Sequence, residues 1–276
     1  MTDFTEVADR VWVGRYPWWD MNVTLVGGER GLVVVDTDAS VVAGRAVLAD
    51  IRRLGAEAVH AVVTTHWHFD HTFGTAAFRE ADPHVPVHAH EEAARNLAEW
   101  GPGIIDRAAR EGGPRCEEFA ETSLVIPDRT FSTWQIIDLG DRAVELIHPG
   151  RGHTGGDIVV RVPDAGVLLT GDLVEESGPP GLGDDSFPLE WAQTLETVGA
   201  LATPSTVVVP GHGAPVDADF VSGQQQEIAD LAAEIRRLAA AGVPVEDAAR
   251  EGSWPWPQEI VTAAVHRGYA QHTDPS

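Results

Sequence analysis

Lysine is absent from this 276-residue sequence, and all 19 of its basic residues are arginine. The absence excludes every mechanism that needs a catalytic or substrate-binding lysine. Against 43 acidic residues, the 19 arginines leave a formal net charge of −24. A field of that sign repels phosphate backbones and anionic lipid, so we expect neither nucleic acid nor a membrane surface as a partner. A small-molecule substrate is expected instead.

Cysteine is also scarce. The single residue, Cys116, cannot form a disulfide within the chain, and a lone free thiol is typical of a reducing compartment. No apolar run approaches the roughly 18–20 residues that a membrane-spanning helix requires. The first residues show neither the basic nor the apolar region of a secretory signal. These absences predict a cytoplasmic protein without a membrane span.

With 43% hydrophobic residues, the chain can bury a full core. Runs typical of strands alternate with helical spacing, which favours a layered α/β architecture. Strands are predicted at residues 11–13, 23–26, 32–35, 59–64, 85–88, 143–147, 158–162, 167–170 and 206–209. Helices are predicted at residues 40–55, 72–79, 91–110 with a break at 101–103, and 189–201. We further expect a β-hairpin over 127–140 and two or three helices over 218–271.

The strongest motif is Thr65-His66-Trp67-His68-Phe69-Asp70-His71, which places three imidazoles and a carboxylate directly after a hydrophobic strand. Residues two apart in an extended chain point the same way, so His66 and His68 can bind one metal ion. Asp70 and His71 then turn toward a second ion. The motif predicts a metal centre, with a polar surface loop as the alternative.

Three further ligand-type side chains lie just before or just after apolar strands. His153 and His212 are flanked by glycines, which let a backbone approach an ion closely. Asp172 ends the run Val167–Gly171, where a carboxylate could bridge two cations. Each of the three alone is commonly a loop or turn residue, but their shared placement indicates one site.

These motifs resemble those of the metallo-β-lactamase superfamily: a His-x-His-x-Asp-His cluster, a later His, a Gly-Asp after a strand, and a late Gly-His. The resemblance spans about residues 11–216. It implies a four-layer αβ/βα sandwich, with the metal site at one edge of the two sheets. It also implies a catalytic domain at 1–216 and a C-terminal helical extension, 217–276, packed on the same domain.

The resemblance implies two metal sites. The implied ligands are His66, His68 and His153 for the first ion, and Asp70, His71 and His212 for the second, with Asp172 bridging the two. It also implies that Asp36, which ends an apolar run, orients a ligand from beneath the site. A turn aspartate that caps the next helix is the alternative for Asp36.

The chain also departs from familiar members of that superfamily. The best-known β-lactamase subclass has Cys where this chain has Asp172, and it commonly binds the substrate carboxylate through a Lys. The similarity to glyoxalase II extends only to the ligands, because the lysine contacts of that enzyme to glutathione cannot exist here.

The predicted function is hydrolysis of a small carbonyl substrate: an ester, thioester, lactone or β-lactam. Two Zn²⁺ ions sharing a hydroxide would provide the nucleophile, and Asp70 and Asp172 would act as the catalytic carboxylates. Ligand identity leaves Fe or Mn open. One alternative is an oxidoreductase that resembles the mono-iron persulfide dioxygenases. A metal-dependent nuclease conflicts with the acidic composition, and a non-catalytic zinc site would be coordinatively closed.

Adjacent tryptophans, Trp18 and Trp19, stand in the turn between the first two predicted strands. Two indoles in one turn are difficult to bury together, so we expect a substrate-binding lid if that turn lies at the metal end.

Two other patterns carry weaker expectations. His88 and His90 form a second His-x-His pair, but no further ligands follow, so a strand end that leads into a helix is predicted. The stripe Ile228, Leu231, Ile235 and Leu238 has the spacing of a core-facing helix face, with a homodimer seam as the alternative.

Overall fold

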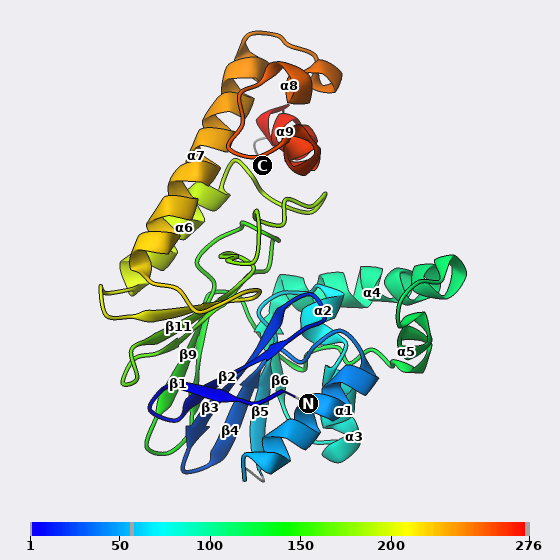
Figure 1. Cartoon of the computed structure of the whole chain (residues 1–276), viewed down its shortest axis with the longest axis vertical. Helices are drawn as coiled ribbons and strands as arrows, with labels where there is room; N and C mark the ends of the chain where they lie inside the picture. The colour runs from blue at the N-terminus through cyan, green and yellow to red at the C-terminus, as the bar shows by residue number, and fades with distance from the viewer. Residues whose placement is uncertain (1, 56–57, 274–276) are drawn as a thin grey trace.

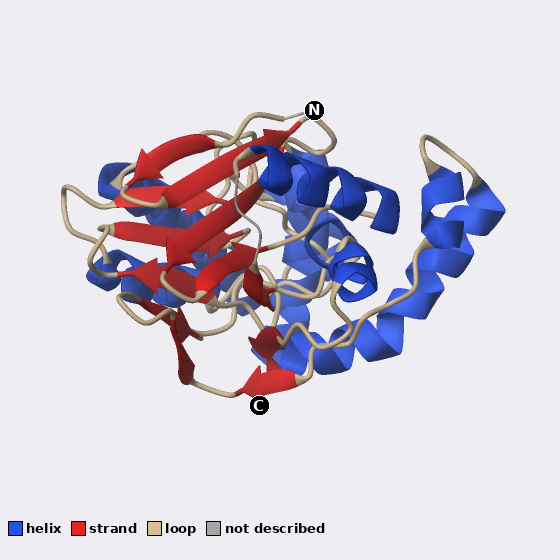
Figure 2. Ribbon diagram, turned by 90° about the horizontal axis from the view of Figure 1, so that it is seen from below, coloured by secondary structure: helices blue, strands red, loops and turns tan. Residues whose placement is uncertain are grey.

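The computed structural model describes residues 2–55 and 58–273, which form two β-sheets packed face to face with helices outside them (Figure 1). The predicted four-layer αβ/βα sandwich is therefore confirmed. Residue 1 and residues 274–276, the outer ends of the two predicted domain ranges, lie outside the described residues. Figure 2 shows the strands of both sheets from below, with helices flanking them.

The larger sheet has seven strands in sequential order, and the smaller has five in the order β12-β11-β10-β9-β8. The strands of the larger sheet are β1 Thr5–Ala8, β2 Val11–Tyr16, β3 Met21–Gly28, β4 Gly31–Val35, β5 Val59–Val63, β6 Val87–His90 and β7 Arg129–Phe131. The strands of the smaller sheet are β8 Trp134–Asp138, β9 Ala143–Ile147, β10 Val159–Val162, β11 Val167–Gly171 and β12 Val207–Pro210.

The main core lies between the two sheets. Val33 and Val63 from the larger sheet belong to the same buried cluster as Leu146, Val160 and Leu169 from the smaller sheet. Central strands such as β4 are buried on both faces because helices cover the outer side. This explains why their sequences are continuously apolar and not alternating.

One helical layer covers the larger sheet, and its helices are α1 Val41–Arg53, α2 Phe69–Thr72, α3 Thr75–Ala81, α4 Glu91–Glu111 and α5 Cys116–Glu121. Ser40 caps α1, because its side chain accepts a hydrogen bond from the Ala43 amide. Helices α1 and α3 can lie close together because Gly44 faces Gly74, where an added Cβ would collide with backbone atoms.

The second helical layer covers the smaller sheet and consists of α6 Trp191–Leu201, α7 Ala218–Ala240, α8 Val245–Glu251 and α9 Gln258–Thr273. The predicted stripe on α7, from Ile228 to Leu238, is buried within the chain against this layer. The core-facing interpretation of the stripe is therefore correct, and the seam interpretation is wrong for these residues. In the described part of the chain, no helix has the length and apolarity needed to cross a membrane.

Two local predictions were wrong. The helix α4 runs without a break through Pro102. Proline removes one backbone donor, but Pro102 and Ala98 are both exposed, so the carbonyl of Ala98 that loses its partner can be hydrated. The predicted hairpin over 127–140 is instead two edge strands in different sheets, since β7 pairs with β6 and β8 pairs with β9. Strand β1 and helix α5 were not predicted at all.

Candidate metal centre

The histidine cluster follows β5 at the carboxyl end of the strand. His66 is buried in the connection, and His68 is the N-terminal cap residue of the one-turn helix α2. Asp70 and His71 lie within α2 itself. The change from extended chain to helical turn lets four side chains from six residues point to one place.

The three isolated ligand candidates meet the cluster at the same edge. Asp172 directly follows β11, and His212 lies two residues beyond β12. These two strands are parallel neighbours, so their carboxyl ends lie together. His153 comes from the loop between β9 and β10. Gly211 allows the close approach, because an added Cβ there would collide with the Asp172 carboxylate.

The side chains form two groups of three. In the first, His153 Nε2 lies 2.8 Å from His68 Nδ1, and the ring of His66 is centred 4.7 Å from each of those two rings. In the second, His212 Nε2 lies 3.3 Å from both His71 Nε2 and Asp70 Oδ2. Each group has ligand atoms close enough to hold one metal ion.

Asp172 lies between the two groups. Its Oδ2 atom is 3.8 Å from His66 Nε2 and 3.5 Å from His153 Nε2 in the first group. Toward the second group, Oδ2 is 3.3 Å from His212 Nε2, and Oδ1 is 3.2 Å from His71 Nε2. The carboxylate is therefore placed to bridge two ions.

These separations fit divalent cations. Tetrahedral zinc bonds of about 2.0–2.1 Å place the ligand atoms about 3.3–3.4 Å apart, which is close to most of the distances between side chains here. Moreover, His66 Nε2 and Asp172 Oδ1 are buried without a hydrogen-bond partner among the residues that the structure describes. Buried polar atoms are seldom left unpaired, and ligation by a metal would satisfy both. Imidazole and carboxylate donors together suit zinc.

The electrostatics of the site also favour cations. Burial alone would lower the pKa of His212, but the carboxylates of Asp172 and Asp70 raise it to about 12. The pKa of His71 is likewise raised well above its usual value despite burial, mainly by Asp172. In turn His212, His71 and His66 hold the pKa of Asp172 well below its usual value against the effect of burial. The buried carboxylates thus require nearby positive charge, which bound metal ions would supply.

Two of the imidazoles are oriented by backbone carbonyls. His153 Nδ1 is hydrogen-bonded to the Gly181 carbonyl at 2.8 Å, and His212 Nδ1 to the Trp19 carbonyl at 2.6 Å. Bonds of this kind fix the ring and its tautomer and leave the other nitrogen directed into the site.

Asp36 lies beneath the site. Its carboxylate is 2.8 Å from His71 Nδ1, and it accepts hydrogen bonds from the amide and the hydroxyl of Thr65. Asp36 has a φ of 61°, and its side chain does not cap α1, because Ser40 does. The contacts are those that an orienting residue would make.

Sequence reasoning missed Asp185. Its Oδ2 atom accepts hydrogen bonds from Trp67 Nε1 at 2.8 Å and from His68 Nε2 at 3.0 Å. Asp185 is 117 residues from His68, and in sequence it stands beside Asp184 with nothing to distinguish the two. Sequence reasoning also missed Glu175, whose carboxylate forms a further possible ligand group with His153 and Asp172, with the three ligand atoms within 4.8 Å of one another.

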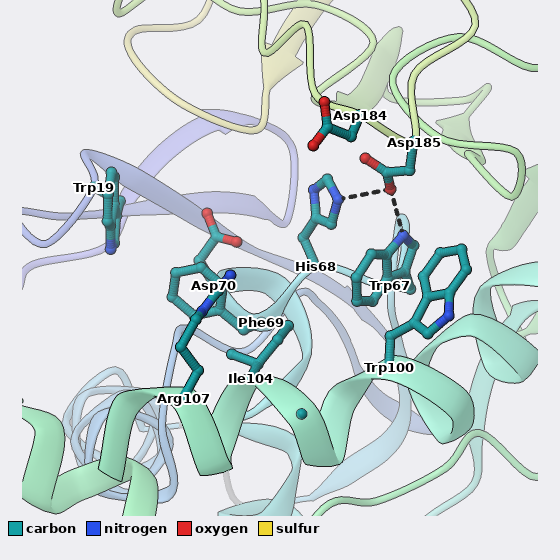
Figure 3. A pocket seen from close by; sticks show the side chains of 11 residues that line it. Trp19, Trp67, His68, Phe69, Asp70, Trp100, Ile104, Arg107, Asp184 and Asp185 are labelled. Carbon is teal, nitrogen blue, oxygen red and sulfur yellow. Dashed lines mark hydrogen bonds and ion pairs between the residues drawn. The ribbon is translucent and has the colours of Figure 1, made fainter. Parts of the chain in front are cut away.

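A cavity of about 730 Å³ opens beside the metal centre (Figure 3). Its lining residues are Trp19, Trp67, His68, Phe69, Asp70, Trp100, Gly103, Ile104, Arg107, Asp184 and Asp185. Of the predicted metal ligands, His68 and Asp70 thus face the cavity, and the others lie deeper.

The structure separates the two tryptophans of the predicted lid. Trp19 is 58% exposed, lines the cavity and contacts Phe69 edge to face. Trp18 packs instead against Phe119, with the guanidinium of Arg115 stacked on its ring. The turn does lie at the metal end, but Trp18 is not among the residues that line the cavity.

The second His-x-His pair serves the fold, as predicted. His90 ends β6 and caps α4 by accepting a hydrogen bond from the Glu92 amide. His88 Nδ1 is bonded to the Gln135 side chain. Neither residue joins the groups of possible metal ligands found in residues 2–55 and 58–273.

Comparison with known proteins agrees with this geometry. Residues 16–212 match the family model of the metallo-beta-lactamase superfamily. The chain belongs to the metallo-β-lactamase superfamily. Its fold is similar to that of a metallo-beta-lactamase from Pontibacter korlensis, with a TM-score of 0.65 and 25% sequence identity. The similarity covers 82% of this chain and 99% of the Pontibacter chain.

Two curated relatives of this superfamily member carry different enzyme names. A linear primary-alkylsulfatase from a Pseudomonas species is 27% identical over 70% of this chain and 41% of its own length. A type 2 metallo-beta-lactamase from a Bacillus species is 27% identical over 70% of this chain and 66% of its own length. The chain thus spans less than two thirds of either relative.

Proposed function

We propose that this member of the superfamily is a metal-dependent hydrolase that binds two zinc ions and cleaves a small carbonyl substrate: an ester, thioester, lactone or β-lactam. The observation that carries the proposal is the meeting of two ligand groups at a shared carboxylate, Asp172, beside an open cavity. Both curated relatives bear the names of hydrolytic enzymes, which supports the class of reaction.

In this proposal the ligand groups keep the assignment expected from the sequence. One ion is held by His66, His68 and His153, the other by Asp70, His71 and His212, and Asp172 contributes to both. Two divalent ions held this way would supply a nucleophile from water near neutral pH and polarise the scissile carbonyl.

The two carboxylates have separate roles because Asp70 lines the cavity and Asp172 does not. Asp70 lines the cavity and is within reach of a bound substrate, so it can accept a proton from water or return one to the leaving group. Asp172 is 5% exposed and does not line the cavity, so its role is to balance cationic charge and fix the spacing of the two groups. Asp36 and Asp185 hold the rings of His71 and His68 in place.

The competing functions are each disfavoured by a feature of the site. A mono-iron oxidoreductase has no need for the second complete group, which is formed by Asp70, His71 and His212. A nuclease needs cations along its cleft, whereas this cavity has one arginine against three aspartates. A structural zinc site has no need of a cavity beside its ligands.

We also propose that residues 1–216 form the catalytic domain and that 217–276 extend it. The family match ends at residue 212, and α7–α9 share a buried cluster with β10, β11 and α6.

The test combines metal analysis with a substrate panel. Purified protein is expected to contain about two equivalents of zinc, and nitrocefin, lactones, thioesters and aryl esters are assayed before and after chelation. Hydrolysis of at least one class, abolished by chelation and restored by zinc, supports the proposal. A single iron per chain, with oxygen consumption and no hydrolysis, would contradict it.

A further inference from the structure

The cavity beside the metal centre is lined by one arginine. Arg107, from α4, is the only arginine among the described residues that line it. No hydrogen bond or ion pair of the Arg107 guanidinium is found in residues 2–55 and 58–273. Most other arginines of this chain are paired with carboxylates, for example Arg151 with Glu190 at 2.7 Å. The guanidinium of Arg107, which lines the cavity in a chain with a net charge of −24, is therefore free to pair with an anion from solution.

Two of the three aspartates in the cavity already have partners. Asp185 is bonded to Trp67 and His68, and Asp70 belongs to the second ligand group. Figure 3 shows Arg107 rising from α4 on the side of Trp19 and Asp70, whereas Asp184 and Asp185 stand on the opposite side. The guanidinium thus faces the space next to the reacting centre.

The rest of the lining is mainly aromatic. Trp67 is held by its bond to Asp185 and packs edge to face against Trp100 at 5.2 Å between ring centroids. Trp100 is 43% exposed, and Ile104 lies between it and Arg107 along α4. A rigid aromatic wall with exposed ring surface gains free energy by covering a flat apolar group.

We propose that this cavity selects substrates that combine a flat apolar group with one anionic group, and that Arg107 recognises the anion. This inference deepens the proposed function and rests on it. The apolar group lies against Trp67, Trp100 and Ile104. The anion, a carboxylate or sulfonate, pairs with Arg107, because a planar guanidinium can donate two parallel hydrogen bonds to two acceptor oxygens. The scissile bond then lies between these contacts, near His68 and Asp70.

Equilibrium binding to the zinc-loaded protein tests the inference without any need for turnover. The probes are 2-naphthalenesulfonate and the neutral 2-naphthalenesulfonamide, which share the aromatic body and differ in charge. The wild type is expected to bind the sulfonate about tenfold more tightly, the scale of one charge-assisted hydrogen bond. Arg107→Gln should abolish that preference, and the preference of the wild type should fall as salt is raised.

Matched variants separate charge from shape. Arg110→Gln removes an exposed arginine from the same helix that does not line the cavity, so the preference should remain. Trp100→Ala should weaken both probes by a similar factor of about five or more, because it removes apolar contact and leaves the charge in place. An equal preference for the sulfonate in the wild type and in Arg107→Gln would overturn the inference, as would no preference in the wild type.

Kinetics distinguish this inference from the proposed function. Nitrocefin carries a carboxylate, and its methyl ester is the neutral match. If either compound is hydrolysed, Arg107→Gln should raise KM for nitrocefin about tenfold and leave KM for the ester unchanged. Loss of the sulfonate preference in Arg107→Gln, with no hydrolysis of any panel substrate, would support the anion site while contradicting the hydrolase. Hydrolysis with a KM for nitrocefin that does not depend on Arg107 would support the hydrolase and contradict the anion site.

Discussion

His212 and Trp19 are joined by a hydrogen bond of 2.6 Å between the imidazole Nδ1 and the backbone carbonyl, across 193 residues of sequence. The amide of Gly213 also donates to the Asp20 carbonyl of the same turn. The turn between β2 and β3 is thereby fixed against the last predicted ligand. Because the backbone makes these contacts, the side chain of Trp19 remains available to the cavity.

Trp19→Ala should therefore change substrate affinity without changing the metal centre. We expect KM for aromatic or long acyl substrates to rise by roughly tenfold, with a smaller change in kcat, since an exposed indole at the cavity is lost. Zinc content, measured by elemental analysis, should stay at the wild-type value. Loss of zinc from this variant would show that the indole supports the turn and not the substrate.

Trp18→Ala is the matched control for the neighbouring position. Its ring packs against Phe119 and under Arg115, so the substitution should lower the free energy of unfolding by about 1–3 kcal/mol. KM should not change for any substrate hydrolysed. Chemical denaturation and steady-state kinetics measure the two effects, and a raised KM would restore Trp18 to the predicted lid.

Asp172→Ala should reduce kcat/KM by roughly a hundredfold or more and lower metal occupancy, because both ligand groups lose their shared carboxylate. His88→Ala should leave occupancy and kcat/KM near the wild-type values, since the His88 side chain bonds to Gln135 and belongs to none of the possible ligand groups among the described residues. Metal analysis and the most active substrate of the panel provide the readouts. Similar losses in the two variants would mean that the wrong histidines were assigned to the metal centre.

Asp36→Asn keeps the size of the side chain but removes the charge that faces His71. We expect zinc affinity, measured by competition with a chromophoric chelator, to fall about 10–100-fold. Thr65→Val is the comparison variant: it removes the hydroxyl that bonds both Asp36 and His66 Nδ1, and it leaves the bond from Asp36 to His71. Wild-type zinc affinity in Asp36→Asn would show that His71 does not depend on the charge of Asp36.

Gln224 on α7 supports the segment that follows Asp172. Its side chain accepts from the Glu175 amide at 3.0 Å and donates to the Leu173 carbonyl at 2.8 Å. Gln224→Ala should lower the free energy of unfolding by about 2 kcal/mol and weaken zinc binding, because the Glu175 amide loses its partner and the Leu173 carbonyl keeps Trp191 Nε1 as a donor but loses Gln224. Gln226→Ala, which removes only an exposed contact with Asp230, should do neither.

The sequence by itself determined the chemistry of the centre. The spacing of His66, His68, Asp70 and His71 after a continuous apolar strand predicts one extended pair and one turned pair. The structure has the turned pair in α2, whereas β5 ends at Val63 and His66 lies in a bend before that helix. The placement of Asp172 and His212 beyond apolar strands was equally readable, because parallel strands end at a common edge. Local patterns sufficed for six of the ligands because each of these lies just beyond a strand or within one helical turn, whereas His153 lies in the loop between β9 and β10.

Only the tertiary structure decided what surrounds the centre. Alternation predicts strands on both sides of residue 132 but not their partners, and the two strands join different sheets. No neighbouring residue in the sequence distinguishes Asp185 from Asp184, or Arg107 from the other arginines of α4. Their roles depend on which surfaces of α4 and of the 181–187 loop face the cavity. Trp18 and Trp19 are adjacent and identical, yet positive φ values at Trp19 and Asp20 turn one indole to the cavity, while the other packs against Phe119. Such choices depend on contacts between segments far apart in the chain, which no short window of sequence contains.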